Sequence, residues 1–185
     1  MKYASPDDVS APPANAISVN SSNSNPPQHG FGDLQAGERS ALLATARRLS
    51  LSPEAEAPGL PLRGRHVAIS GADHQSPSAL LFERAAASLG ARVSHIGPDA
   101  LVLDDRRTVG AARLLGTLYD AVDCVALQPE RAQLLQKLAG VPIYSDLGGN
   151  TSPLRELVPA LEAESRGSAD PMLCLVQAVL LEALG

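Results

Sequence analysis

Residues 62–96 read LRGRHVAISGADHQSPSALLFERAAASLGARVSHI, which predicts a strand, a loop, a helix and a second strand. The apolar, β-prone run at 66–70 is the first strand, and small polar residues at 71–78 form the loop. Helical spacing follows at 78–89, with Gly90 as its end, and the second strand is expected at 91–96. Such a βαβ unit places the loop beside a helix N-terminus, where open α/β sheets bind anions.

The same alternation continues toward the C-terminus. Further strands are expected at 122–127 and 141–144, with helices at 108–118 and 129–139. Additional helices are expected within 31–50, at 153–164 and at 172–184. Strands separated by helices of this length predict right-handed crossovers. We therefore expect an α/β fold: a three-layer open sheet, mostly parallel, with about four strands and helices on both faces.

The ends and the linker differ in composition from this alternating section. Residues 1–30 are rich in Pro, Ser, Asn and Ala and are expected to form a disordered tail. Residues 51–61 contain three prolines and are expected to form a linker. The remainder, 31–185, is long enough for one ordinary domain.

Composition excludes several function classes. The net charge is -5 and the basic residues are scattered, which disfavours nucleic acid as a partner. No apolar run approaches the ~20 residues of a membrane span, and the N-terminus lacks the apolar core of a signal peptide, so we expect a cytoplasmic protein. Cys124 and Cys174 lie in apolar runs and are expected to be buried thiols. We expect no cofactor.

Several polar residues could carry chemistry, but each pattern is weak. The four histidines do not share a metal-ligand spacing, so no metal site is expected; they are His29, His66, His74 and His95. Asp73-His74 is a possible acid–base pair, and the charge run 104–107 is expected to be a solvated turn. Gly148-Gly149 indicates a turn. The serines Ser70, Ser76 and Ser78 have no partner histidine at a recognisable spacing for a hydrolase.

A set of short motifs, in chain order, resembles the N-terminal, carbamoyl-phosphate-binding domain of the aspartate/ornithine carbamoyltransferases. The matches are FGDL at 31–34 with ALLATARRL at 41–49, LRGRHVAIS at 62–70, FERAAASLGA at 82–91, ARLL at 112–115, YDAV at 119–122, VPI at 141–143 and DP at 170–171. The resemblance covers about residues 31–185. It implies the same fold for this chain.

The functional positions of that family are altered here. Its phosphate loop, S-T-R-T-R, falls on Gln75, Ser76, Pro77, Ser78 and Ala79, so both arginines are replaced. The resemblance leaves Gln75, Ser76 and Ser78 as a residual phosphate loop and identifies no catalytic residue. Carbamoyl phosphate is a dianion, and each missing charge-assisted contact is worth ~1.5–3 kcal/mol, so binding and transfer are expected to be weak.

Three more family positions are changed. Val125 stands where a further arginine is expected, and Asp170 and Leu173 replace the histidine and glutamine of a His-Pro-x-Gln motif. The family's second, amino-acid-binding domain would follow the last helix. Because the sequence ends at Gly185, the acceptor site is expected to be absent.

Three functions are compatible with this pattern. The first is a catalytically inactive binding or oligomerisation module, forming a trimer or pairing with a full-length carbamoyltransferase paralogue, with the apolar helix at 172–184 as a docking surface. The second is a sensor that binds a less anionic small ligand in the old phosphate crevice. The third is one half of a split carbamoyltransferase of amino-acid metabolism.

Overall fold

The computed structural model describes residues 36–51, 60–71, 73–97, 108–125, 127–164 and 169–185. The expected tail at 1–30 and the charge run at 104–107 lie outside the described residues, as does most of the 51–61 linker. Within the described ranges, no helix has both the length and the apolar character that crossing a bilayer requires.

The sheet has four strands, and every adjacent pair is parallel. β1 (His66–Ser70) and β3 (Ala121–Cys124) lie at the centre, and β2 (Arg92–Ile96) and β4 (Ile143–Tyr144) lie at the edges. This confirms the predicted parallel α/β sheet. The third strand ends earlier than predicted because the chain turns after Cys124, where the Leu127 amide donates to the Cys124 carbonyl at 3.3 Å. β4 is also shorter than predicted.

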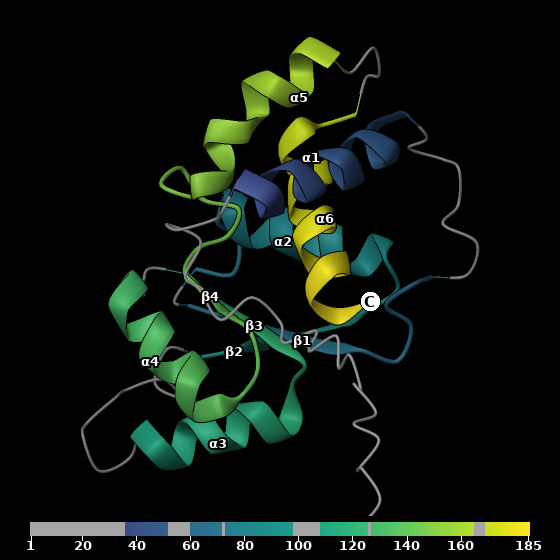
Figure 1. Cartoon of the computed structure of the whole chain (residues 1–185). Helices are drawn as coiled ribbons and strands as arrows, with labels where there is room; N and C mark the ends of the chain where they lie inside the picture. Colours follow the sequence, from purple (N-terminus) through teal and green to yellow (C-terminus); the bar gives the residue numbers. More distant parts are fainter. Residues whose placement is uncertain (1–35, 52–59, 72, 98–107, 126, 165–168) are drawn as a thin grey trace, which may run out of the picture.

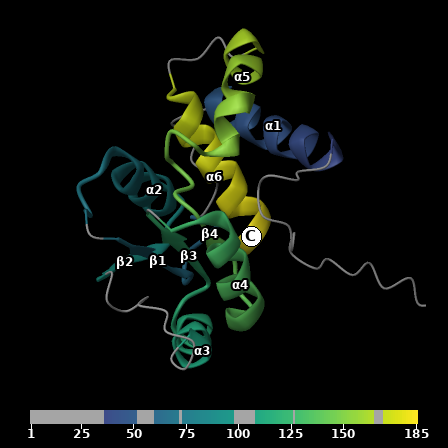
Figure 2. The ribbon, with the colours of Figure 1, turned by 90° about the vertical axis from the view of Figure 1, so that its left-hand side faces the viewer.

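Helices cover both faces of the sheet. α3 (Thr108–Leu118) and α4 (Pro129–Ala139) lie on one face, and α2 (Pro77–Ser88) and α6 (Pro171–Leu184) lie on the other (Figure 1; Figure 2). The three predicted layers are therefore confirmed. α1 (Ala36–Leu51) and α5 (Val158–Glu164) pack on the outer side of α6 and add a further layer. The 3-10 helix η3 (Pro153–Leu157) leads into α5.

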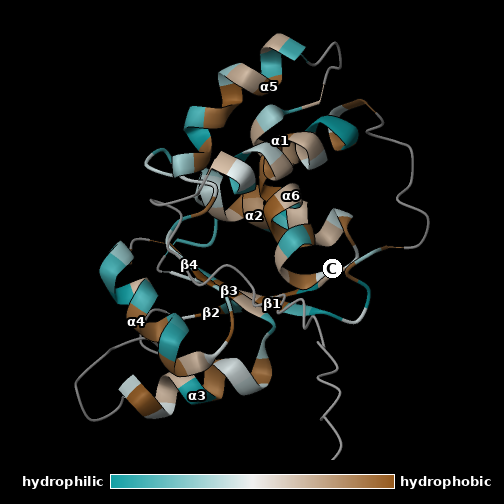
Figure 3. Cartoon of the chain, in the orientation of Figure 1, coloured by the Kyte–Doolittle hydropathy of each residue, from teal (hydrophilic) through white to brown (hydrophobic). Residues whose placement is uncertain are grey.

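Side chains alternate across the sheet and build a core on each face. In β1, Val67 and Ile69 face α2 and α6, whereas Ala68 faces α3 and α4. Figure 3 shows apolar residues on the surfaces that face inward and polar residues on the outer turns of α4 and α5. In β3, the same alternation directs Asp123 toward the α2 and α6 side.

The apolar helix α6 is buried inside this chain. Leu175, Val176, Ala178 and Leu180 are fully buried in the core, which α1, α2 and α5 complete. The sequence left two interpretations of this helix, a core element or a docking surface. The second is wrong, because the chain's own helices already cover these apolar side chains.

Candidate functional site

The strand order β2-β1-β3-β4 creates a topological switch point between β1 and β3, because the connections that follow these two strands lead to opposite edges of the sheet. From β1 the chain crosses through α2 to β2, and from β3 it crosses through α4 to β4, which lies on the opposite side of the sheet. The carboxyl ends of β1 and β3 are the usual ligand-binding place in such sheets. Here the two residues that follow the strands, Gly71 and Val125, lie close together. The Val125 amide donates to the Ser70 carbonyl at 2.8 Å, and a β-carbon at Gly71 would lie 3.0 Å from the Cβ of Val125.

Most of the predicted phosphate loop forms the N-terminus of α2. Ser76 is the N-cap, and its Oγ accepts from the Ala79 amide at 3.3 Å; Pro77 occupies the first helical turn and has no N–H. The Ser76 and Ser78 hydroxyls lie 3.5 Å apart, and Gln75 is exposed. Ala79 is fully buried in the core, so a long cationic side chain does not fit at this position.

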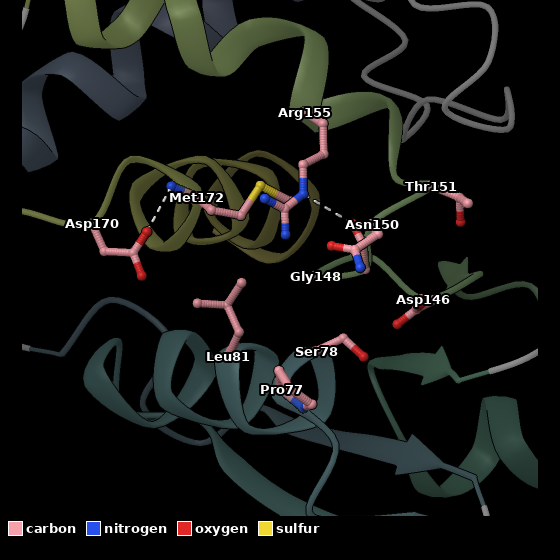
Figure 4. Close-up of a pocket in the computed structure, with 11 residues that line it drawn as sticks. Pro77, Ser78, Leu81, Asp146, Gly148, Asn150, Thr151, Arg155, Asp170 and Met172 are labelled. Atoms are coloured by element: carbon pink, nitrogen blue, oxygen red, sulfur yellow. Dashed lines mark hydrogen bonds between the residues drawn. The ribbon is translucent and has the colours of Figure 1, made fainter.

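A pocket of about 470 Å³ opens next to this segment (Figure 4). Its walls come from the start of α2, the turn after β4, η3 and the start of α6. Of the residues singled out in the sequence, five line it: Pro77, Ser78, Gly148, Gly149 and Asp170. Gln75, Ser76, Ala79, Val125 and Leu173 are not among its lining residues. The volume lies within the range of small-molecule sites.

Arg155 is the one cation among the residues that line this pocket. Its Nε donates to the Gly149 carbonyl at 3.3 Å, which fixes the guanidinium against the turn, and Figure 4 shows the guanidinium directed into the pocket. Within the described residues, Arg155 forms no ion pair. The sequence analysis missed Arg155, because only tertiary folding brings η3 to the start of α2.

Asp146 is the most unusual backbone position of the site. It follows β4 and has φ 55, the one positive value at a non-glycine residue among the described residues. Its Oδ1 is buried without a hydrogen-bond partner. Its carboxylate packs against Gly149, where a β-carbon would collide with it, and a β-carbon at Gly148 would lie 2.9 Å from the Ser78 carbonyl. The turn predicted at Gly148-Gly149 is confirmed, and both glycines are needed for close packing.

Asp170 supplies the second carboxylate of the pocket, but it already caps α6. Its Oδ1 accepts from the Met172 amide at 3.0 Å and from the Leu173 amide at 3.4 Å, and Pro171 begins the helix. The first amides of α6 are therefore satisfied within the chain, and the carboxylate offsets the positive end of the helix dipole.

The sequence analysis also missed Asp123, whose carboxyl lies beside the turn that carries Asp146. Asp123 in β3 is fully buried, its Oδ1 accepts from the Leu147 amide at 3.0 Å, and its Oδ2 has no partner among the described residues. Burial, together with the nearby Asp146 charge, raises the pKa of Asp123 to about 7. Its one signal in the sequence is a single polar residue inside an apolar strand.

The other chemistry-bearing residues do not assemble a reaction centre. Cys124 and Cys174 are buried and free, as predicted, and burial raises the pKa of Cys124 to about 12, which keeps this thiol protonated. The His74 and His95 rings lie edge to face at 4.8 Å, and His95 Nε2 is 3.4 Å from a Glu83 oxygen. Across the described part of the chain, no group of three or more His, Cys, Asp or Glu side chains is placed to hold a metal ion.

Comparison with known proteins identifies the fold. No family model matches the sequence. Among solved structures, the chain is similar to ornithine carbamoyltransferase from Pyrococcus furiosus, at a TM-score of 0.58 and 24% identity over 71% of this chain and 42% of that one. It is also similar to the mitochondrial ornithine carbamoyltransferase from Coccidioides immitis, at a TM-score of 0.60 and 17% identity over 78% and 47%.

A third similar structure is the anabolic ornithine carbamoyltransferase from Campylobacter jejuni, at a TM-score of 0.51 and 18% identity over 63% and 37% of the two chains. This chain therefore has a carbamoyltransferase-like α/β fold. It spans less than half the length of each of these three proteins.

Proposed function

We propose that this chain is a catalytically inactive module that binds a small molecule on a carbamoyltransferase-like fold. The observation that carries the proposal is the charge of the pocket: among the residues that line it, Arg155 is the one cation, and Asp146 and Asp170 are the two anions. A pocket of this size with a few polar groups and apolar walls from Leu81 and Met172 is suited to binding.

The same charges argue against carbamoyl transfer. Transfer from a dianion needs several cations and free donors at the developing charge. One guanidinium and two carboxylates line this pocket, and Asp170 already accepts hydrogen bonds from the first amides of α6. Pro77 offers no N–H at the start of α2. These features favour a ligand that is less anionic than carbamoyl phosphate.

Two measurements on the purified chain test the proposal. Incubation with carbamoyl phosphate and either ornithine or aspartate is expected to yield neither citrulline nor carbamoyl aspartate. Thermal unfolding in the presence of small molecules is expected to show saturable stabilisation by at least one of them. That stabilisation should disappear in Arg155→Ala and persist in Arg113→Ala, a matched control on the exposed side of α3. Turnover would contradict the proposal, as would stabilisation that Arg155→Ala leaves intact.

A role in assembly is the second candidate, and one observation favours it. Leu114 and Leu118 on α3 and Leu134 on α4 are 58%, 50% and 49% exposed. These helices cover the face of the sheet opposite the pocket, so a partner there would leave the pocket open. Sedimentation of the purified chain, alone and with a full-length carbamoyltransferase, separates this candidate from a lone monomer.

The split enzyme is the third candidate. It requires a second chain to supply the acceptor site and the missing cations. Citrulline formation that appears only when cell extract is added to the purified chain would support it, and Arg155→Ala would then be expected to reduce that activity.

A further inference from the structure

A second cavity lies at the free edge of the sheet, beside β4. Its volume is about 430 Å³, and its walls come from β4, from α4 and from the residues that lead into η3. β4 is an edge strand, and β3 is its one partner among the strands that the structure describes. An uncovered strand edge is a template for pairing with another extended segment, so native proteins cover or block such edges.

The register of β4 shows which of its peptide groups face away from β3. The Asp146 amide donates inward, to the Cys124 carbonyl at the end of β3, at 3.2 Å. Peptide groups of successive strand residues point to opposite sides, so those of Ile143 and Ser145 point outward. The Ile143 amide donates there to Oε1 of Gln136 at 3.3 Å, whereas the Ser145 amide has no hydrogen-bond partner among the described residues. The outer edge of β4 therefore retains a donor for a further strand.

The chain itself supplies a segment of suitable character in the residues that precede α1. Residues 16–20 read AISVN, in which Ile17 and Val19 alternate with smaller residues, a pattern typical of a strand with one apolar face. Residues 9–32 contain no Asp, Glu, Lys or Arg. This neutral stretch is compatible with the cavity, because Asp146 is the one charged residue among those that line it.

The position of α1 brings this segment within reach of β4. Arg39, near the start of α1, forms an ion pair with Glu156 of η3 at 3.1 Å. η3 begins at Pro153, which lines the cavity, so α1 starts on the side of the molecule that holds the cavity. Residues 21–35 join the segment to α1 and span up to about 50 Å when extended. The connection is therefore long enough.

From this arrangement we infer that residues 16–20 dock in this cavity as an additional edge strand on β4. The backbone of the segment pairs with the outward peptide groups of Ile143 and Ser145, and its apolar side chains contact the apolar part of the lining, which includes Leu127 and Pro129. Because the segment is tethered, its effective concentration at β4 is about millimolar, so even a weak contact is occupied within one chain. Docking closes this edge of the sheet to other chains. The inference is independent of the proposed binding function.

Paired variants of the full chain test this inference without altering the described fold. Ile17→Pro/Ser18→Pro removes two successive backbone donors, so it blocks pairing whichever side of the segment meets β4. Asn23→Pro/Ser24→Pro is the matched control, because it makes the same change in the same tail but outside residues 16–20.

Amide hydrogen exchange, measured by NMR, is the readout. The Ser145 amide should exchange at least about tenfold faster in Ile17→Pro/Ser18→Pro than in the wild type and in the control. The Val122 amide, which donates to the Pro142 carbonyl inside the sheet, should exchange equally in all three and so reports that the fold is intact. Equal exchange of Ser145 in the three proteins would overturn the inference.

Two further outcomes distinguish the occupant. A synthetic peptide of residues 14–22, added to Ile17→Pro/Ser18→Pro, should restore slow exchange of Ser145 as it saturates, and no effect at millimolar peptide would overturn the inference. Protection in the wild type should not depend on protein concentration. Protection that rises with concentration would show that a second copy supplies the strand, and it would overturn docking within one chain.

Discussion

The charged side chains of the candidate site come from segments that lie far apart in the sequence. Arg155 comes from η3, Asp146 from the end of β4, and Asp170 from the N-cap of α6. Asp123 is fully buried beside the turn that carries Asp146. Each of these groups has a measurable consequence that does not require the ligand to be known.

Asp123 makes stability depend on pH. Its pKa is raised from 3.8 to about 7 by burial, so between these values the folded state holds a proton that the unfolded state has released. The contribution of this group to stability is therefore fully present below about pH 4 and is lost as the pH rises through about 7, by up to roughly 4 kcal/mol. Asp123→Asn should flatten this slope, because an amide does not ionise. At pH 8 it should raise the free energy of unfolding by about 1–2 kcal/mol, since the ionisation penalty that it removes exceeds the cost of a buried amide left without a partner.

Denaturant unfolding of both proteins at a series of pH values from 4 to 8 measures this effect. The account predicts that the two curves cross: the variant is less stable than the wild type at low pH, where Asp123 is protonated, and more stable at high pH. A variant that is less stable than the wild type at pH 8 would show that ionised Asp123 has a compensating partner.

We expect Asp146 to supply a charge to the pocket while its left-handed backbone lowers the free energy of unfolding. A residue in the left-handed region is strained, and glycine relieves that strain. Asp146→Gly should therefore raise the free energy of unfolding by about 1 kcal/mol while it removes a charge from the pocket. Asp170→Ala is the matched comparison, since it removes the other pocket carboxylate but loses a helix cap, at a cost of about 1 kcal/mol. Equal losses of stability in the two variants would contradict this assignment.

Two glycines of α3 allow the close packing of α3 against α4 to be tested. A β-carbon at Gly116 would collide with the Ala139 carbonyl of α4, whereas one at Gly110 meets nothing within 4 Å. Gly116→Ala should therefore destabilise the protein by forcing α3 and α4 apart. Gly110→Ala should stabilise it by about 0.5–1 kcal/mol through helix propensity. Thermal unfolding of the two variants should show shifts of opposite sign, and shifts of the same sign would show that α3 and α4 do not pack as closely as described.

The role of α6 as a core element is also testable. Leu175 is fully buried, so Leu175→Ala should cost about 2–5 kcal/mol. Leu134→Ala on α4 is the control, because this side chain is 49% exposed and its loss should cost less than about 0.5 kcal/mol. If both variants unfold at the same denaturant concentration, α6 does not form the centre of the core.

The sequence predicted the elements better than it predicted the site, for physical reasons. Periodicity and turn residues report local structure, so the four parallel strands and the helices on both faces were predictable. The strand at 122–127 was extended too far because its apolar pattern continues past the turn at Val125. The role of α6 was left open because an apolar helix has the same pattern whether the chain itself or a partner covers it.

The candidate site could be predicted only in part. Ser78 and Asp170 were found through the resemblance to the carbamoyltransferases. Arg155 and Asp146 were missed, since no local pattern marks a side chain whose role depends on contacts between separate elements. The buried position of Ala79 likewise became visible only in the packed structure.

The molecule as a whole combines a carbamoyltransferase-like fold with a pocket whose charged lining residues are one Arg and two Asp. Gly71 and Val125 lie close together at the switch point between β1 and β3, and the adjacent pocket is lined by one guanidinium and two carboxylates. A shared fold does not fix a shared activity, because activity depends on the side chains of the site. The combination supports binding without transfer.

Isothermal titration of the purified wild-type chain with carbamoyl phosphate tests this account most directly, with thermal unfolding of the same sample as the control for folding. The account predicts a cooperative unfolding transition and no saturable binding heat. Saturable, tight binding of carbamoyl phosphate by the wild-type chain would contradict it.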